Sequence, residues 1–154
     1  MICIIHPITL SIVNISNEKK IMEAQTEAKL LVVDDVALNR ALMSGILRKG
    51  DWIVETADNG ENAFEKVKAS NYEAILMDVQ MPVLDGIQAT ERIRAYEKSI
   101  GRYTPIVAIT ALPAEEHKMK CLEAGMDYFI NKPVSGPDLI ALFKEIIEKH
   151  STPE

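Results

Sequence analysis

The chain has 154 residues, which is enough for one domain with a real hydrophobic core but too few for two full domains. It carries 17 Lys and Arg residues against 23 Asp and Glu, a net charge of −6, so it lacks the basic surface that nucleic-acid binding requires. Its two cysteines, Cys3 and Cys121, lie too far apart for a CxxC or zinc-ligand spacing, which argues against a disulfide scaffold and a structural zinc site. This cysteine usage suits a reducing compartment, so we expect a cytoplasmic protein with no nucleic-acid partner.

Residues 2–15 form an uncharged, partly apolar stretch that Pro7 interrupts. The stretch is shorter than the roughly 20 residues of a membrane span, and it lacks the basic region and cleavage site of a secretion signal. A cleaved signal or an anchor is the alternative interpretation. We expect a poorly ordered extension over residues 1–28, one domain over residues 29–150, a tail over residues 151–154 and no membrane association.

From residue 29 onward, short apolar runs alternate with amphipathic stretches. The apolar runs predict strands over residues 30–33, 52–57, 74–77, 106–109 and 128–130. The stretches between and after them predict helices over residues 37–49, around 63–67, 87–96, 113–124 and 138–149. Asn59 and Gly60 predict a turn before the second of these helices.

Five strands in strict alternation with five helices are typical of βαβ units, which build a parallel sheet. The predicted strands are apolar throughout instead of alternating with polar residues, as in strands that are buried on both faces. The sequence therefore predicts an α/β fold of the doubly wound type, with helices on both sides of one five-stranded parallel sheet.

Polar side chains stand at the ends of four predicted strands. Asp34 and Asp35 end the first strand, Asp78 the third and Thr110 the fourth, while Lys132 follows the fifth. All strands of an open parallel sheet have their carboxyl ends at one edge, where ligands bind. We therefore expect these five residues, which lie far apart in the sequence, to meet in one site.

Such a site needs a cation. Two carboxylates about 4 Å apart repel by about 4 kcal/mol at an effective dielectric constant of 20. Three carboxylates, one Mg²⁺ and the Lys132 ammonium sum to zero charge, which a phosphoryl group can approach. Thr110 and Lys132 offer donors to phosphoryl oxygens, and a carboxylate can act as a nucleophile that forms an aspartyl phosphate.

Simpler interpretations exist for each residue alone. Paired aspartates after a strand often form a turn or cap the next helix, and Thr110 and Lys132 are ordinary strand-end and surface residues. Two other functions also stay open. One is a Mg²⁺-dependent phosphatase, although Gln80 stands where such an enzyme places its second catalytic Asp. The other is an interaction module that is never phosphorylated.

Four motifs occur in order at the spacing of a known family. They are Val32-Val33-Asp34-Asp35, the run from Met77 to Gly86 (MDVQMPVLDG), Ile109-Thr110-Ala111 and Asn131-Lys132-Pro133. Over residues 29–149 the chain resembles the response-regulator receiver domain of two-component phosphorelays. The run from Met77 to Gly86 is most similar to receivers of hybrid histidine kinases. The resemblance implies a flavodoxin-like (βα)5 sandwich with strand order 2-1-3-4-5.

The resemblance also implies a role for each acidic residue. Asp78 would be the phosphoryl acceptor. Asp35, Asp78 and the backbone carbonyl of Gln80 would be direct Mg²⁺ ligands, and Asp34 would act on the metal mainly through water. In this view Mg²⁺ is the required cofactor.

The remaining motif residues would act as a switch. Thr110 would move toward the phosphoryl group, Lys132 would pair with it, and the peptide bond from Lys132 to Pro133 would be cis. Phe129 takes the position of the aromatic switch residue but lacks the hydroxyl of a Tyr. Gly86 would serve the sharp turn after Pro82.

The implied partner is a histidine kinase or a histidine phosphotransfer protein, whose phosphohistidine would donate to Asp78. Partner choice would lie in the loops around Asp78 and on the helix that begins at Ala37. No output domain follows Lys149, so we expect the chain to act through protein contacts, including phosphorylation-dependent self-association. It would be a phosphoacceptor module and not an enzyme with turnover.

Overall fold

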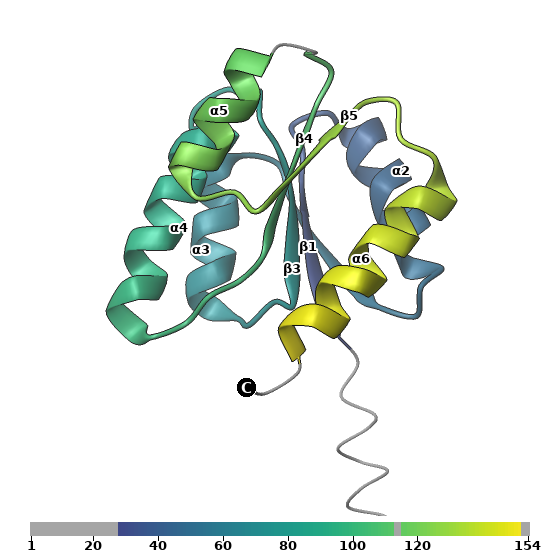
Figure 1. Ribbon diagram of the computed structural model, residues 1–154, viewed down its shortest axis with the longest axis horizontal. Coiled ribbons are helices and arrows are strands. Elements are labelled where there is room, and N and C mark those ends of the chain that lie inside the picture. Colours follow the sequence, from purple (N-terminus) through teal and green to yellow (C-terminus); the bar gives the residue numbers. More distant parts are fainter. Residues whose placement is uncertain (1–27, 113–114, 152–154) are drawn as a thin grey trace, which may run out of the picture.

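The computed structural model of the chain describes residues 28–112 and 115–151. Within these residues five strands alternate with five helices (Figure 1). In chain order they are β1 (Lys29–Val33), α2 (Ala37–Arg48), β2 (Ile53–Ala57), α3 (Gly60–Ala69), β3 (Ala74–Asp78), α4 (Gly86–Ile100), β4 (Ile106–Thr110), α5 (Glu115–Ala124), β5 (Tyr128–Asn131) and α6 (Gly136–Ser151). The predicted α/β alternation is confirmed.

The strands form one parallel sheet in the order β2-β1-β3-β4-β5, as the resemblance implies. Helices α3, α4 and α5 cover one face of the sheet, and α2 and α6 cover the other (Figure 1). Leu31 and Val33 of β1 point into the first layer, whereas Leu30 and Val32 point into the second. Because both faces are covered, every position of the central strands β3 and β4 is buried, which explains their unbroken apolar runs.

The chain before β1 was expected to be an extension over residues 1–28. Residues 1–27 and 152–154 lie outside the described part, so this expectation stays a prediction. The carbonyl of Ala28 accepts a hydrogen bond from the Ile53 N–H, which joins the start of β1 to β2. Among the described residues, no helix combines the length and the apolar character that a membrane crossing requires.

Helices α3, α4 and α6 begin before their predicted starts, α6 at Gly136 instead of residue 138, and the predicted helix start at residue 113 lies outside the described residues. Asn59 and Gly60 do not form a separate turn, because α3 starts at Gly60 and the Asn59 side chain caps it by accepting the Asn62 N–H at 2.8 Å. Asn serves turns and helix N-caps by the same side-chain bond, so the local sequence alone does not separate the two. Helix α4 starts one residue earlier than predicted, behind a capping box of Asp85 and Gln88.

The apolar pattern of α2 predicts the helix but not its buried face. Leu38 and Leu42 are 77% and 57% exposed, while Met43, Ser44 and Leu47 face the core. Helix α5 is similar, because Cys121 is its only buried residue between Glu115 and Ala124. Both helices therefore present apolar side chains to solvent, which an ordinary surface helix does not need for folding.

A buried ion-pair network holds α4 against the amino ends of β4 and β5. The Arg94 guanidinium contacts Glu97 Oε2 at 2.7 Å and Asp127 Oδ2 at 2.8 Å. It also donates to the carbonyls of Gly125 and Thr104. The Glu97 side chain is only 1% exposed, so its charge depends on Arg94 for most of its compensation.

Replacing Arg94 by Met should therefore strongly destabilise the fold. We expect the free energy of unfolding to fall by about 3 kcal/mol or more, because the substitution leaves a buried carboxylate without its main partner. Urea unfolding followed by circular dichroism measures the loss. The matched control is Arg92→Met on the same helix, whose pair with Glu61 is exposed and is worth less than about 1 kcal/mol. Equal losses in the two variants would show that the Arg94 network does not stabilise the fold in this way.

Candidate functional site

The carboxyl ends of four strands bring the predicted residues to one edge of the sheet. Asp34 and Asp35 directly follow β1, Asp78 is the last residue of β3, Thr110 is the last residue of β4, and Lys132 follows β5. The register places Val33 beside Met77, so the residues that follow them on β1 and β3 become neighbours. The edge-of-sheet prediction is thus confirmed for the position of these residues.

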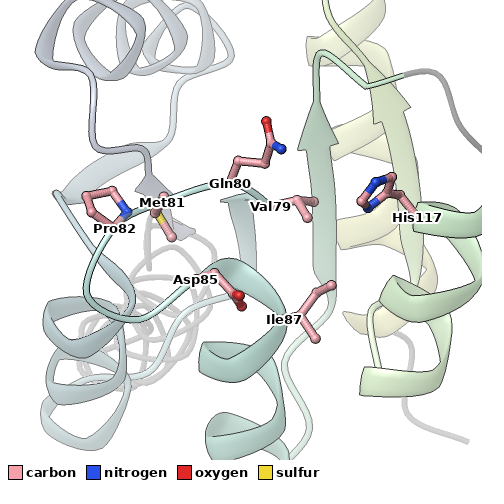
Figure 2. A pocket seen from close by; sticks show the side chains of 7 residues that line it. All are labelled: Val79, Gln80, Met81, Pro82, Asp85, Ile87 and His117. Carbon is pink, nitrogen blue, oxygen red and sulfur yellow. The ribbon is translucent and has the colours of Figure 1, made fainter.

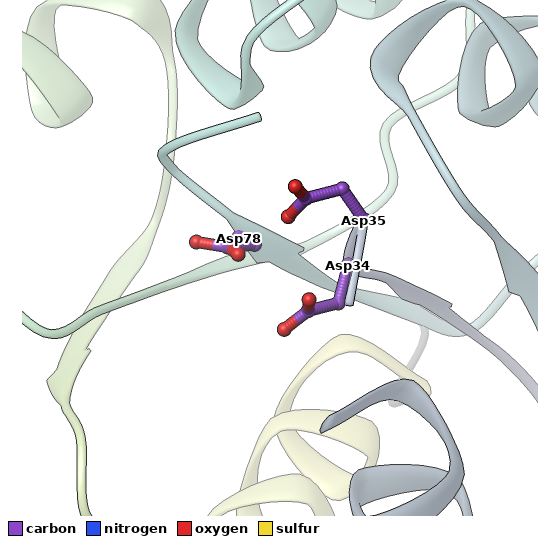
Figure 3. Close-up of side chains that lie close together, drawn as sticks. All are labelled: Asp34, Asp35 and Asp78. Atoms are coloured by element: carbon purple, nitrogen blue, oxygen red, sulfur yellow. The ribbon is translucent and has the colours of Figure 1, made fainter. Parts of the chain in front are cut away.

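The three aspartates form one cluster. Each offers a carboxylate oxygen, and these oxygens all lie within 4.8 Å of one another. Figure 3 shows Asp34 and Asp35 side by side after β1, with their carboxylates on the side of Asp78. Asp34 and Asp78 are buried whereas Asp35 is exposed, so the cluster opens to solvent at Asp35.

Lys132 supplies the positive charge of the cluster. Its Nζ lies 3.3 Å from Asp34 Oδ2 and 3.6 Å from Asp78 Oδ2. Within the described residues, no other cation forms an ion pair with the three aspartates, so the cluster carries a charge of about −2 by the simple count of ionised groups. Oxygen ligands with this surplus charge fit a hard divalent cation such as Mg²⁺.

The carboxyl group of Asp78 holds its proton unusually well. The pKa of Asp78 is raised to about 6, mainly by burial; the Asp34 and Asp35 carboxylates also raise it, while Lys132 and the Gln80 N–H lower it. The Gln80 N–H donates to Asp78 Oδ1 at 3.2 Å. A cation at the cluster would favour the ionised form, which is the nucleophilic one.

The loop between β3 and α4 needs Gly86 for space. A Cβ atom at Gly86 would lie 2.2 Å from the Asp78 carbonyl oxygen, so any side chain there would displace the backbone of the Asp78 strand. Gly86 thus lets the loop turn back against the Asp78 strand, where its N–H donates to the Val79 carbonyl, while the left-handed backbone of the loop is at Val83, with φ of 71°. The Leu84 N–H donates to the Pro82 carbonyl across Val83 and forms a tight γ-turn.

Thr110 lies at the cluster's edge of the sheet, whereas Phe129 lies further back on β5, where it pairs with Ala108. Thr110 is buried, and its Oγ1 accepts the Leu112 N–H at 3.2 Å. Phe129 is half-buried and packs against the core under α3, α4 and α5. The peptide bond between Lys132 and Pro133 is cis, as the resemblance implies.

A hollow of about 470 Å³ lies beside the cluster, between the loop after β3 and α5. Figure 2 shows His117 of α5 facing Val79 and Ile87 across it, and Gln80 and Asp85 also line it. The sequence gives no signal that His117 lies near the loop after β3. His117 reaches the hollow because the first turns of α5 lie near the loop after β3, and no local sequence motif indicates this arrangement.

Sequence reasoning also missed the residues that hold Asp34. Its Oδ1 accepts the Val36 N–H, and its backbone carbonyl accepts a bond from the Arg40 guanidinium, both at 2.8 Å. The Asp34 N–H donates to the carbonyl of Ala57 on β2. The bonds from Arg40 and to Ala57 use backbone atoms of Asp34, so no pattern of residue types signals them; the bond from the Val36 N–H is the turn that an Asp at this position favours.

Comparison with known proteins agrees with this arrangement. The family model described as "Response regulator receiver domain" matches residues 30–144. The chain is 38% identical over 138 residues to the osmosensing histidine protein kinase SLN1 of Saccharomyces cerevisiae, covering 86% of this chain. It spans only 11% of that kinase, and 5% and 6% of two hybrid signal transduction histidine kinases of Dictyostelium discoideum.

Two solved structures are similar in both sequence and fold. The receiver domain of sensor histidine kinase PA1611 from Pseudomonas aeruginosa PAO1, with a magnesium ion in its active-site cleft, is 34% identical at a TM-score of 0.73, and the match covers 80% of this chain and 99% of that one. The receiver domain of Ssk1 from Saccharomyces cerevisiae, in complex with the histidine phosphotransfer protein Ypd1, is 32% identical at a TM-score of 0.76, with 83% and 94% covered. With its five-stranded sheet, its acidic cluster and the family match over residues 30–144, the chain belongs to the response-regulator receiver domains of two-component systems.

Proposed function

We propose that the chain accepts a phosphoryl group on Asp78 from a phosphohistidine of a histidine kinase or a histidine phosphotransfer protein. The observation that carries the proposal is the position of Lys132, whose ammonium reaches both Asp34 and Asp78 in a cluster that still lacks positive charge. A nucleophilic carboxylate, a cation site and an ammonium within one small space are the parts that phosphoryl transfer needs.

The chemistry is an in-line exchange of one bond for another. A carboxylate oxygen of Asp78 forms a bond to phosphorus while the bond from phosphorus to the donor imidazole nitrogen breaks, and the imidazole keeps that electron pair. The Lys132 ammonium and the Thr110 hydroxyl donate to phosphoryl oxygens and stabilise their charge. The transfer needs no reactant besides the phosphorylated donor, which fits a phosphoacceptor module without substrate turnover.

The same cluster would hold Mg²⁺. Asp35, Asp78 and the Gln80 carbonyl are the proposed direct ligands, and Asp34 acts mainly through water. When bound, the ion neutralises phosphoryl oxygens and the carboxylates together. The fit rests on the oxygen donors within 4.8 Å of one another and on the surplus negative charge, and the magnesium-bound PA1611 receiver supports it.

Phosphorylation would place a group with roughly two negative charges at the sheet edge, in place of the single charge of the Asp78 carboxylate. Thr110 would move toward the phosphoryl group and Lys132 would pair with it. Phe129, which is only half-buried, would then repack. The surface of α5, β5 and α6 would then change shape for a partner or for a second phosphorylated copy. The free thiol of Cys121 is consistent with the proposed cytoplasmic location.

The face of α2 is the proposed docking surface for the donor. Val36, Leu38 and Leu42 are exposed on or next to this helix, which starts immediately after the acidic pair. A donor histidine must reach Asp78, and an apolar patch beside the site supplies the contact area. The Ypd1 complex of the similar Ssk1 receiver supports a partner of this class.

Incubation with a small-molecule phosphoryl donor and Mg²⁺ should add one phosphoryl group, measured by intact mass spectrometry. We expect Asp78→Asn to abolish the mass increase, because the variant loses the nucleophilic oxygen. Asp85→Asn is the matched control in the same loop and should be labelled normally, since Asn also caps a helix. Unchanged labelling of Asp78→Asn would refute Asp78 as the acceptor, and labelling in the presence of EDTA would refute the metal requirement.

Stability should depend on pH through Asp78 in metal-free buffer. Its folded-state pKa of about 6 exceeds the ordinary value of 3.8, so between these pH values the folded chain binds a proton that the unfolded chain has lost. The contribution of Asp78 to stability is thus fully present below about pH 4 and is lost as the pH rises through about 6, by at most about 3 kcal/mol. Urea unfolding in EDTA should show this fall for the wild type relative to Asp78→Asn.

Mg²⁺ should reverse the effect above pH 6 by binding only the folded state. Parallel pH profiles for the wild type and Asp78→Asn in EDTA would contradict the raised pKa.

Docking on α2 predicts a selective loss of protein-to-protein transfer. We expect the double substitution Leu38→Glu and Leu42→Glu to slow transfer from a phosphorylated histidine phosphotransfer protein at least tenfold, because it places charges in an apolar contact. Labelling by a small-molecule donor should not change. Met119→Glu on α5, also an exposed apolar position, is the control. Equal losses with both kinds of donor would show damage to the site instead of docking.

A further inference from the structure

Arg40 makes a contact that the proposed reaction does not yet use. It lies on α2, and its Nη1 donates to the backbone carbonyl of Asp34 at 2.8 Å, six residues earlier in the chain. This bond reaches backward across the start of the helix, where Val36 provides no side-chain cap and the first turn has no acidic residue. Arg40 is therefore no substitute for an N-cap, which accepts helix N–H groups, but it ties the loop before the helix to the first turns of the helix.

The carbonyl that Arg40 binds belongs to the peptide unit between Asp34 and Asp35. Because a peptide unit is planar, fixing its carbonyl also fixes the N–H and the Cα position of Asp35. Asp34 is held at three other points, by bonds with Ala57, Val36 and Lys132. Within the described residues, no hydrogen bond or ion pair reaches the Asp35 carboxylate, so its position depends on the backbone.

The Arg40 guanidinium binds a backbone carbonyl and none of the three carboxylates. It therefore occupies no carboxylate oxygen that a metal ion could use. Arg40 itself is half-buried and is held in turn through α2, whose buried Ser44 donates its hydroxyl to the Arg40 carbonyl at 2.6 Å. Groups just outside a metal site that orient its ligands commonly change metal affinity by 10- to 100-fold, roughly speaking, when they are removed.

We propose that Arg40 is a positioning residue that sets the Asp35 carboxylate for metal binding through the carbonyl of Asp34. The inference rests on the proposed function, because it assumes that the cluster binds Mg²⁺. It adds that metal affinity is controlled from a helix that also carries the proposed docking surface.

Isothermal titration calorimetry of the full chain with Mg²⁺ tests the proposal. We expect Arg40→Met to weaken binding about tenfold, and Arg40→Lys, which keeps a charged donor without the planar fork, about threefold. Arg48→Met is the matched control, since Arg48 lies on the same helix and also donates to a backbone carbonyl, that of Val54 on β2. Its Mg²⁺ affinity should stay within about twofold of the wild type, because Val54 pairs with Leu30 near the start of β1, at the opposite end of that strand from Asp34.

Two further readouts separate positioning from general damage. At saturating Mg²⁺ the labelling rate of Arg40→Met with a small-molecule donor should return to near the wild-type rate, since Asp78, Thr110 and Lys132 are intact. The amide signal of Asp35 in ¹⁵N NMR spectra without metal should shift in both Arg40 variants but not in Arg48→Met. These readouts do not follow from a loss of stability alone.

The proposal is overturned if Arg40→Met and Arg48→Met bind Mg²⁺ within twofold of each other. If the Met variant does not fold, Arg40→Lys takes its place. The proposal is overturned if Arg40→Lys binds Mg²⁺ with wild-type affinity. Failure of the wild type to bind Mg²⁺ or to be labelled would instead refute the proposed function, and this inference with it.

Discussion

Mutual repulsion of three carboxylates at one edge of the sheet is the constraint around which the site is built. Asp34 and Asp78 are buried, and the ammonium of Lys132 lies between 3 and 4 Å from both, at 3.3 and 3.6 Å. Such an arrangement is unfavourable unless surrounding structure enforces it, because each like-charge contact costs several kcal/mol in a partly buried place. The pairing of β1 with β3 supplies that enforcement, since strand registers cannot shift without exposing the core.

The opposite edge of the same sheet has the converse arrangement. There Arg94 joins α4 to Asp127 and to backbone carbonyls near the starts of β4 and β5, and every charge has a partner of opposite sign. Asp127 additionally accepts the Ile106 N–H, which fixes where β4 begins. The Arg94 network thus pairs its charges where the strands start, whereas the acidic cluster keeps a surplus of negative charge where the strands end.

The apolar runs of the strands and the polar residues at the ends of four of them were enough to predict a parallel sheet and the five residues of its edge, whereas the strand order was implied by the family resemblance. They suffice because burial on both faces leaves a continuous apolar signal, and because a parallel sheet gathers its carboxyl ends. Other features could not be predicted for equally physical reasons. The spacing of Leu38 and Leu42 reports a helix but not which side faces the core. The roles of Gly86 and Arg40 depend on backbone atoms of distant residues, which no pattern of side chains records.

Helix α5 differs from the other helices in how little attaches it to the core. Cys121 is its one buried residue, and Met119 and Leu122 lie on its solvent side. A displacement of this helix would uncover little apolar area, so the hydrophobic effect offers small resistance to it. A central strand such as β3, buried at every position, could not shift without losing the core. An element tethered this lightly can rearrange for a modest input of free energy and return unaided, which is what a reversible reporter of events at the neighbouring loops requires.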